Sequence, residues 1–249
     1  MIKVVSVVRD REMYARCVAD NACFEGCGLV PLYNDTENLP ITVRYNSFID
    51  SLEEPCWVMF CHEDWSPSVP VREKLETLSP DFLYGPIGVF VEEHDKVDVI
   101  VQYGFVSQSS KNGRHCARLR GKEFEHRVDT FDCQCLIVHS SLLGKYGLRF
   151  DENLTFDMYV EDFCVNAYEK YGIESRTIYL PCRHCSTGTI GTRFHNSLAY
   201  VKDKYRDSRK RYSTTVGHLN TFGRNQDKAV FKWKRKLISK LMYRLLNEQ

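Results

Sequence analysis

The residues best suited to chemistry follow a short apolar run in the first quarter of the chain. The run from Cys56 to Cys61 (CWVMFC) is typical of a strand buried on both faces, and it ends in His62, Glu63 and Asp64. Ligands bind just outside the carboxyl ends of strands in open parallel sheets. Carboxylates are hard ligands for Mg²⁺ or Mn²⁺, and histidine also suits Mn²⁺. The pattern predicts a divalent-metal site that bridges to nucleotide phosphates, although acidic strand ends are also common without a metal.

A second pair of candidate residues stands at the start of a predicted helix. Apolar residues with a 3.6-residue period predict a helix that begins near Tyr159 and ends near Tyr171. Glu161 and Asp162 fall in its first turn, where the helix dipole favours an ionised carboxylate, as a general base requires. At about 100° per residue, Asp162 points away from the core and Glu161 lies nearer the buried stripe. Acids at a helix start are equally explained by the dipole alone.

His184 is a third candidate, because it follows a predicted strand, Arg176 to Leu180, and a proline. A lone histidine is more often structural than a ligand, so this position alone decides nothing.

The cysteines offer an alternative metal site. The chain has 11 of them, an odd number, and nothing in the sequence suggests export, so we expect reduced, packed thiols. The CxC and CxxC spacings at Cys133, Cys135, Cys182 and Cys185 would suit a tetrahedral zinc site, but neither pair stands in a glycine-containing knuckle.

The elements that must position these residues alternate between strand and helix. We expect strands at Ile2 to Val8, Gly28 to Tyr33 and Cys56 to Cys61, with a helix capped by Asp10 between the first two. Pro40 opens a second helix with apolar residues at positions 41, 45, 48, 49 and 52. The resulting βαβαβ order predicts an α/β fold with a parallel sheet. No glycine-rich phosphate loop follows any of these strands.

The later elements are predicted to be shorter and more mixed. We expect a helix over 69–78, a strand over 82–90 that is broken by Gly85, Pro86 and Gly88, and a strand over 131–138. A short helix capped by Ser140 or Ser141 should follow and end at Gly147. The tract from Glu92 to Arg127 alternates apolar runs with polar turns, which predicts hairpins or a mobile loop.

Composition excludes several classes of protein. A chain of 249 residues with a net charge of +1 is ordinary for a globular protein and gives no general argument for a nucleic-acid partner. No apolar run approaches the roughly 20 residues that span a bilayer, and the first strand is too short for a signal-peptide core. We therefore expect a cytoplasmic chain.

Together these stretches resemble the family-two-like glycosyltransferases of the GT-A fold, of the bacterial saccharide-biosynthesis type. The resemblance covers about residues 1–190 and rests on four segments in order. The first is the opening βαβ unit, and the second is HED at 62–64, which looks like the metal-binding DXD motif. The third is FDENLTF followed by YVEDFC, which looks like the acceptor-side segment. The fourth is CRHCSTG, which is similar to the terminal H-x-S-x-G. It implies a GT-A-like (Rossmann-like) α/β fold with a mixed, mostly parallel sheet flanked by helices.

The resemblance also implies roles for the metal and catalytic candidates. Asp64 resembles the last DXD acid, which binds the metal most directly, and His184 is similar to a histidine that completes the metal shell in relatives. Asp162, with Glu161 beside it, resembles the catalytic base. His62 is a departure, because an acid is usual at that position.

On the nucleotide side, the resemblance places further residues. Asp35 looks like the acid that recognises the base, while Ser6 and Arg9 lie where the first loop meets the nucleotide. Asn46 matches a helix asparagine that precedes the DXD strand, and Glu63 lies within the DXD-like motif itself.

The implied activity is an inverting, metal-dependent transfer of a sugar from a nucleotide-sugar donor to a saccharide or a lipid-linked saccharide. The metal, Mn²⁺ or Mg²⁺, would offset charge on the departing nucleotide diphosphate while a carboxylate takes the proton of the acceptor hydroxyl. One alternative is a nucleotidyltransferase, which would want a glycine-rich loop where this chain has VVRDREM. Another is a non-catalytic saccharide-binding protein on the same fold.

Beyond residue 190 the resemblance ends, and we expect a helical, basic extension over 191–249. Ala199 to Tyr212 is charged and predicted to be helical, and Val230 to Leu246 has an apolar face. Residues 228–249 carry seven Lys or Arg against one Glu, which suits either peripheral contact with anionic lipid at the inner face of the membrane or packing on the catalytic domain.

Overall fold

A computed structural model describes residues 1–249 apart from 94–97, 110–114, 120–124, 187–189, 217–218 and 220–249. Within the described residues, strand and helix alternate as far as the third strand, and hairpins and short strands follow. This order confirms the βαβαβ opening that the sequence predicts.

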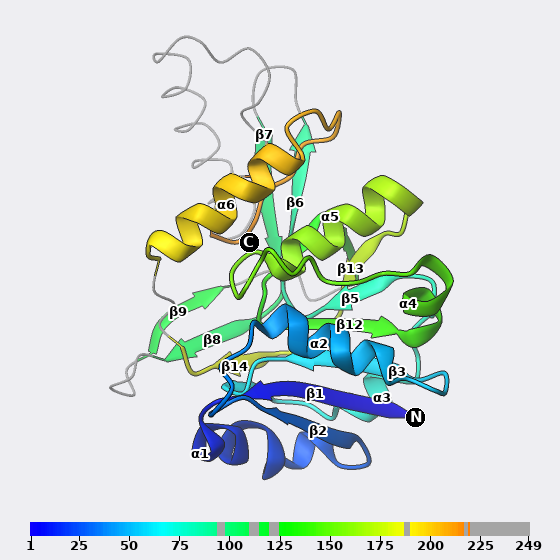
Figure 1. Cartoon of the computed structure of the whole chain (residues 1–249), viewed down its shortest axis with the longest axis vertical. Helices are drawn as coiled ribbons and strands as arrows, with labels where there is room; N and C mark the ends of the chain where they lie inside the picture. The colour runs from blue at the N-terminus through cyan, green and yellow to red at the C-terminus, as the bar shows by residue number, and fades with distance from the viewer. Residues whose placement is uncertain (94–97, 110–114, 120–124, 187–189, 217–218, 220–249) are drawn as a thin grey trace.

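A mixed sheet lies at the centre of the described part of the chain (Figure 1), with the strand order β10-β13-β5-β12-β3-β1-β2. Its strands are β1 (Ile2–Val8), β2 (Gly28–Tyr33), β3 (Trp57–Cys61), β5 (Leu83–Gly85), β10 (His126–Val128), β12 (Cys135–His139) and β13 (Ser175–Thr177). β1 pairs in parallel with β2 and β3, and β13 pairs in parallel with β5. β12 runs antiparallel to both β3 and β5, and β10 runs antiparallel to β13. The predicted mixed α/β architecture is therefore confirmed.

Two smaller sheets extend the central one, and they agree with the hairpins predicted for the tract from Glu92 to Arg127. Their strands are β11 (Thr130–Phe131), β6 (Gly88–Glu93) and β7 (Asp98–Tyr103) in one sheet, and β4 (Trp65–Pro67), β14 (Cys182–His184), β8 (Val106–Ser109) and β9 (His115–Leu119) in the other. In Figure 1 the second of these sheets lies at the end of the molecule where α1 lies, opposite α4. β14 is antiparallel to β4, so His184 stands opposite Trp65 and beside the end of β3.

Helices cover both faces of the central sheet. They are α1 (Arg11–Tyr14), the π-helical turn η1 (Ala15–Ala19), the 3₁₀ turn η2 (Ala22–Phe24), α2 (Ile41–Asp50), α3 (Val71–Leu75), α4 (Ser140–Tyr146), α5 (Tyr159–Tyr171) and α6 (Thr192–Lys204). Side chains of α2, α4, α5 and α6 pack on one face, and those of α1, η1 and α3 pack on the other. Alternate residues of β3 enter the two cores, Val58 and Phe60 on one side and Met59 and Cys61 on the other. Every position of this strand is apolar because neither of its faces meets water.

The predicted caps at Asp10 and Gly147 are confirmed, whereas α4 is capped by His139, whose ring accepts from the N–H of Ser141, and not by Ser140 or Ser141. The carboxylate of Asp10 accepts a hydrogen bond from the backbone N–H of Met13 and caps α1. Gly147 and Gly172 follow α4 and α5 with φ angles of +60° and +68°, in the left-handed region that glycine adopts without strain.

Two predicted strands are wrong in extent, and a third is broken where the sequence predicts. The predicted strand over 82–90 is interrupted between Gly85 and Gly88, at Pro86, and its two parts, β5 and β6, belong to different sheets. The strand over 131–138 divides into β11 and β12 around the polar residues Asp132 and Gln134. The predicted strand Arg176 to Leu180 is shorter in the structure, where β13 ends at Thr177 and a connection follows. The next strand, β14, begins after Pro181.

The chain after residue 190 begins with a helix earlier than predicted. α6 spans Thr192–Lys204 rather than Ala199 to Tyr212, because Phe194 and Val201 already face the core. Tyr205 and Tyr212 pack in the same hydrophobic cluster as α5. The predicted helix over 230–246 lies outside the described residues.

No helix of the described residues is long and apolar enough to cross a bilayer.

Candidate functional site

A cavity of about 360 Å³ opens where β1, β2 and β3 end. Its wall includes Arg9 after β1, Asn34 after β2 and the residues 62–64 after β3. The start of α5, the start of α6 and residues 215–216 complete it. The cavity therefore lies at the carboxyl edge of the parallel strands, where the sequence predicts a ligand site.

The three predicted metal ligands come together in this cavity. His62, Asp64 and His184 each present a ligand atom, and these atoms lie within 4.8 Å of one another. Oδ1 of Asp64 is 4.0 Å from Nδ1 of His62 and 3.2 Å from Nε2 of His184. Two nitrogens and a carboxylate oxygen form a donor set that suits Mn²⁺ among the divalent cations.

The tautomer of His62 is set by Tyr159. The hydroxyl of Tyr159 donates its one proton to the carbonyl oxygen of Cys133 at 2.7 Å, and it lies 3.1 Å from Nε2 of His62. Nε2 must therefore be the donor in the second contact, which leaves the lone pair on Nδ1, the nitrogen that faces Asp64. Burial lowers the pKa of His62 to about 4, so the ring is neutral at pH 7. A neutral ring with a free lone pair is the form that binds a metal.

His184 lacks the hydrogen bonds that a buried histidine normally makes. The residue is 8% exposed, and within the described residues neither of its ring nitrogens has a hydrogen-bond partner. The 3.2 Å contact of Nε2 with Asp64 is close enough for attraction but lacks hydrogen-bond geometry. Burial lowers the pKa of His184, and the Asp64 carboxylate more than offsets this, so the net shift is upward. A buried ring with unused nitrogens suits the binding of a cation, and these residues fit the predicted metal.

Asp64 is held ionised by the same pair of rings. Burial would raise its pKa, but contacts with His184 and His62 outweigh burial and lower it. The carboxylate is therefore available as a ligand over a wide pH range.

Glu63 lines the cavity, but its carboxylate is engaged by the backbone. Oε2 accepts hydrogen bonds from the N–H groups of Arg9, at 2.6 Å, and of Asp10, at 2.9 Å. Burial raises the pKa of Glu63 despite these two bonds. This side chain fixes the loop between β1 and α1 and so shapes the rim of the cavity.

Among the other residues predicted to bind the nucleotide, only Arg9 lines the cavity. Ser6 is fully buried within β1, with its hydroxyl 3.4 Å from the thiol of Cys61. Asp35 lies outside the cavity wall and pairs with Arg11 at 2.8 Å. In their place, Asn34 lies in the wall and holds a turn by hydrogen bonds in both directions with the backbone of Leu39.

Asn46 also has a structural environment. Its amide donates to the carbonyl oxygen of Phe150 at 2.9 Å and accepts from the N–H of Phe150 at 2.9 Å. Both bonds join α2 to the loop before α5. The structure places Asn46 away from the cavity wall, so the predicted contact with the nucleotide finds no support in its geometry.

The predicted orientation of Asp162 is wrong. Asp162 does not point to solvent: it is 2% exposed, and it accepts hydrogen bonds from Lys204 and from the hydroxyl of Tyr205, at 2.9 Å. Glu161 instead lines the cavity. The periodicity assumed one buried face, whereas α6 covers the opposite face of α5 and buries Asp162 as well.

Glu161 has a carboxylate oxygen without a hydrogen-bond partner among the described residues, unlike Asp162. It is 2% exposed, and its Oε2 has no hydrogen-bond partner in the described part of the chain. Burial, followed by the charges of Asp132 and Asp157, raises its pKa well above the ordinary value for glutamate. A buried carboxyl with a raised pKa in a cavity is a frequent property of proton-transfer residues.

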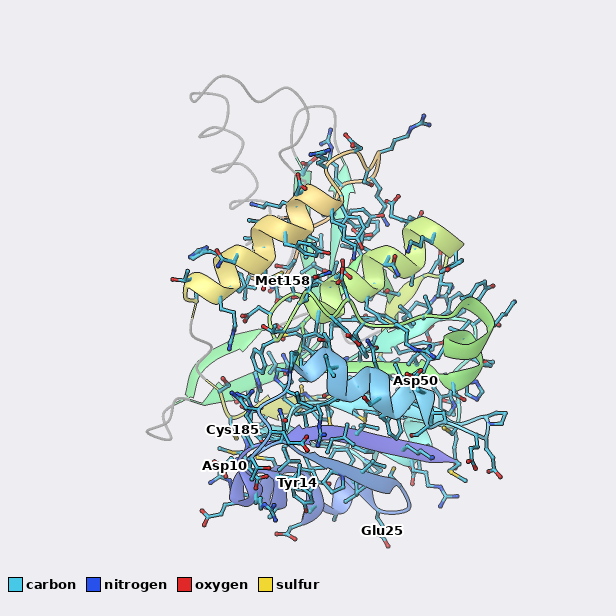
Figure 2. All side chains as sticks on the ribbon, viewed as in Figure 1. Asp10, Tyr14, Glu25, Asp50, Met158 and Cys185 are labelled. Carbon is cyan, nitrogen blue, oxygen red and sulfur yellow. The ribbon has the colours of Figure 1, made fainter. Side chains whose placement is uncertain are left out.

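The backbone before α5 is strained at this point. Met158 has a φ angle of +66°, in the left-handed region that a non-glycine residue seldom adopts. It is 1% exposed, lines the cavity and lies at the start of α5, on the side that faces α6 (Figure 2). The unusual turn directs Asp157 into the cavity and starts α5 one turn before Asp162.

Sequence reasoning missed Asp132, which lines the same cavity. Its charge acts on the pKa values of both His62 and His184 and also on that of Glu161. Its Oδ2 accepts a hydrogen bond of 2.7 Å from Thr215, and its Oδ1 accepts one of 3.3 Å from the N–H of Gln134. A carboxylate at the second position of a mostly apolar predicted strand was the available signal.

α6 supplies a wall that the sequence did not predict. Nε of Arg193 lies 2.6 Å from Oδ2 of Asp157, and its guanidinium lies 4.6 Å from the ring centroid of Phe156. Arg193 and Phe194 line the cavity. The signal for these residues is weak, because they follow the last recognisable motif of the sequence.

The alternative zinc site is not formed. Within the described residues, only His62, Asp64 and His184 gather as a group of three or more metal-binding side chains. All four CxC and CxxC cysteines contribute to the two apolar cores or pack against them, and Cys135 and Cys182 are buried.

No protein-family model and no curated protein matches this sequence. Among solved structures, S. aureus TarS 1-349 in complex with UDP matches with a TM-score of 0.51 and 10% sequence identity, over 84% of this chain and 66% of that chain. S. aureus TarS matches with a TM-score of 0.50 and 11% identity, over 84% of this chain and 40% of that chain. GalNAc-T7 with UDP, GalNAc and Mn²⁺ gives a TM-score of 0.49 and 8% identity, over 98% of this chain and 57% of that chain.

The likeness to TarS shows that this chain has the GT-A glycosyltransferase fold. The chain spans between 40% and 66% of the length of these TarS structures.

Proposed function

We propose that this chain transfers a sugar from a nucleotide-sugar donor to a hydroxyl of a saccharide or lipid-linked saccharide, with inversion and with the help of a divalent cation. The observation that carries the proposal is that His62, Asp64 and His184 meet in the same cavity as the buried acid Glu161. The GT-A fold of the chain supports it. A non-catalytic protein would have no need to keep a buried, unpaired carboxyl beside a set of metal-binding side chains.

His62, Asp64 and His184 would hold Mn²⁺ or Mg²⁺. When bound, such a cation offsets the negative charge that develops on a departing nucleotide diphosphate. Tyr159 keeps the lone pair of His62 directed at the centre, and Asp64 supplies the ionised oxygen. Arg9 adds a positive charge to the cavity wall on the side of β1.

We assign the role of base to Glu161 rather than to Asp162. Glu161 lines the cavity and has a free carboxylate oxygen, whereas Asp162 is paired with Lys204. A carboxyl whose pKa is raised by burial and by neighbouring acids is a stronger proton acceptor, once ionised, than an exposed one. Its Oε2 would take the proton of the acceptor hydroxyl as the new glycosidic bond forms.

Asp132 lines the same cavity as the proposed cation site and Glu161, and we assign it to the sugar of the donor. A carboxylate fixed by Thr215 and by a backbone N–H accepts hydrogen bonds from sugar hydroxyls with defined direction. Exposed apolar side chains at the cavity, Ile190 at 58% and Val216 at 52%, would contact the acceptor.

The broader organisation forms part of the same proposal. We propose a glycosyltransferase domain over about 1–190 and an extension over 191–249, which supplies α6 to the site. Residues 228–249 would contact anionic lipid, and the protein would act in the cytoplasm or at the inner face of a membrane.

Calorimetry of UDP with Mn²⁺ tests the cation site. UDP is the first nucleotide to try because a TarS structure contains it. We expect Asp64→Asn to abolish the dependence of UDP binding on Mn²⁺ while the protein stays folded. Asp35→Asn, which makes the same change outside the cavity, is the matched control. If Asp64→Asn binds UDP and Mn²⁺ as tightly as the wild type, the assignment fails.

Release of UDP from UDP-sugars then separates an enzyme from a binding protein. Metal-dependent release with any of a panel of UDP-sugars, reduced in Glu161→Gln, supports transfer. Tight binding of UDP-sugars with no turnover in water or with saccharide acceptors would favour the non-catalytic alternative.

A further inference from the structure

Two thiols from distant parts of the chain meet beside the proposed cation site. Sγ of Cys17 lies 3.9 Å from Sγ of Cys185, although the residues are 168 positions apart. Cys17 belongs to the π-helical turn η1 and is fully buried, whereas Cys185 follows β14 and is half-buried. Figure 2 places Cys185 at the end of the molecule where Asp10 and Tyr14 of the first helix lie.

Cys185 is tied to two of the three proposed metal ligands. It follows His184 directly in the chain, and its N–H donates a 2.9 Å hydrogen bond to the carbonyl oxygen of Asp64. A displacement of the Cys185 backbone therefore moves the His184 ring, the Asp64 carboxylate, or both. These two groups are already only 3.2 Å apart, so a small shift changes the shape of the site.

We propose that Cys17 and Cys185 form a reversible disulfide that weakens cation binding at His62, Asp64 and His184. A disulfide needs an S–S distance of about 2.0 Å, so the two sulfurs must approach by about 1.9 Å from their present 3.9 Å. Cys17 is enclosed in the core between the sheet and α1, so most of this movement falls on the less enclosed Cys185. The consequence for cation binding rests on the function proposed above, whereas the disulfide itself does not.

The chemistry requires a two-electron oxidant, for which we name a hydroperoxide. The thiolate of half-buried Cys185 attacks the peroxide oxygen, forming a sulfenic acid as the O–O bond breaks and hydroxide leaves. The thiol of Cys17 then attacks the Cys185 sulfur, so that the S–S bond forms, the S–O bond breaks, and the thiol proton leaves with the oxygen as water. With hydrogen peroxide the balance is two thiols and one peroxide to one disulfide and two waters. Burial raises the pKa of Cys17, which suits it to the second step rather than the first.

Tryptic peptides identify the bond directly. Cleavage after Arg183 and Arg193 gives a peptide, 184–193, that contains Cys185 as its one cysteine. Cleavage after Arg16 and Arg44 gives 17–44, which contains Cys17, Cys23 and Cys27. After treatment of the full-length protein with hydrogen peroxide, we expect these two peptides to be linked and to separate on reduction with dithiothreitol.

Matched variants show which cysteine is used. The link should persist in Cys23→Ser and in Cys27→Ser, which alter half-buried thiols in the same peptide, and should be lost in Cys17→Ser. Because Cys17 is fully buried, Cys185→Ser is the second variant, at a position that tolerates change better. A link that survives Cys17→Ser and disappears in Cys23→Ser or Cys27→Ser overturns the assignment, as does the absence of a link in the wild type.

The switch is tested by Mn²⁺ titration in the presence of UDP, with reduced and oxidised protein. We expect oxidation to weaken Mn²⁺ binding by about 10- to 100-fold, as the loss of groups that orient metal ligands does, and dithiothreitol to restore it. Cys17→Ser should bind Mn²⁺ equally before and after peroxide. Linked peptides with unchanged Mn²⁺ affinity would overturn the switch. If the reduced wild type binds no Mn²⁺, the proposed function fails, and the peptide link still decides on the disulfide.

Discussion

Tyr159 connects the first turn of α5 to the end of β3 through a hydrogen bond of 3.1 Å between its hydroxyl and Nε2 of His62. Since the same hydroxyl donates to the carbonyl oxygen of Cys133, His62 is the donor to Tyr159. One phenol thus selects the histidine tautomer that directs a lone pair toward Asp64. The helix that carries Glu161 also orients a proposed metal ligand.

Tyr159→Phe should weaken Mn²⁺ binding by about 10- to 100-fold, because loss of the partner frees the tautomer and rotation of the ring. It also leaves the carbonyl oxygen of Cys133 without its donor, which costs about 1–3 kcal/mol of stability. Mn²⁺ titration and urea denaturation measure the two effects.

Tyr14→Phe is the control for Tyr159→Phe. The hydroxyl of Tyr14 is buried and has no hydrogen-bond partner in the described part of the chain, so its loss should not reduce stability or Mn²⁺ affinity. Equal Mn²⁺ affinity in Tyr159→Phe and Tyr14→Phe would argue against the proposed role of Tyr159.

Local pattern was sufficient for the elements that carry the site. The all-apolar strand β3 and the periodic helix α5 were predicted because each is defined by contacts within a few residues and by burial of a regular face. The convergence of His62, Asp64 and His184 was also predicted, for His184 by the resemblance to a known family rather than by its position after a predicted strand. What the sequence lacked was the direction of individual side chains.

Asp162 and Asn46 show why direction could not be predicted. The periodicity of α5 identifies one apolar face, but the opposite face is covered by α6, where Lys204 and Tyr205 meet Asp162. Asn46 satisfies backbone groups of a loop 104 residues away. Both environments depend on packing between segments that are far apart in the sequence. The pattern of each segment by itself does not indicate which other segment it packs against.

The acid stability of the wild type should depend on Asp151. Burial alone would raise the pKa of this carboxyl, but hydrogen bonds from Lys204, Asn153 and Tyr200 outweigh burial. The net effect lowers the pKa from 3.8 to about 2. A depressed pKa in the folded state contributes stability above the unfolded value, and that contribution is lost as the pH falls through the folded value. Between about pH 4 and pH 2, the wild type should therefore lose more stability than Asp151→Asn does.

Urea denaturation at a series of pH values measures this difference. Asp203→Asn is the control, because Asp203 is 73% exposed and pairs with the equally exposed Arg206. A wild-type profile that is parallel to that of Asp151→Asn from pH 4 to pH 2 would show that the Lys204 contact does not lower the pKa of Asp151.

Thr215→Val should reduce the rate of sugar transfer without weakening the binding of UDP and Mn²⁺. The hydroxyl of Thr215 fixes Oδ2 of Asp132 at 2.7 Å, and its loss lets the carboxylate rotate away from the donor sugar. Misplacement of a positioning group costs up to about 100-fold in rate. Steady-state kinetics should show the change in kcat, and Thr192→Val, at an exposed threonine of α6, should leave kcat unchanged.

The last prediction separates Glu161 from Asp162. Glu161→Gln should retain the affinity for UDP and Mn²⁺ and lose about 10²- to 10⁴-fold in transfer, the effect of removing a general base. Asp162→Asn should keep most of its rate per folded molecule. It should instead lower the free energy of unfolding by about 1–3 kcal/mol, because Lys204 loses a charged partner at 2.8 Å and keeps only Asp151.

A double-mutant cycle with Lys204→Met tests the structural role of Asp162. Asp162→Asn should cost less stability in the Lys204→Met background than in the wild type, since the lysine charge that Asp162 pairs with is then absent. Transfer kinetics on the same proteins decide the catalytic role. If Asp162→Asn loses transfer by the larger factor while Glu161→Gln retains it, Asp162 is the base, and the pair with Lys204 must open when the acceptor binds.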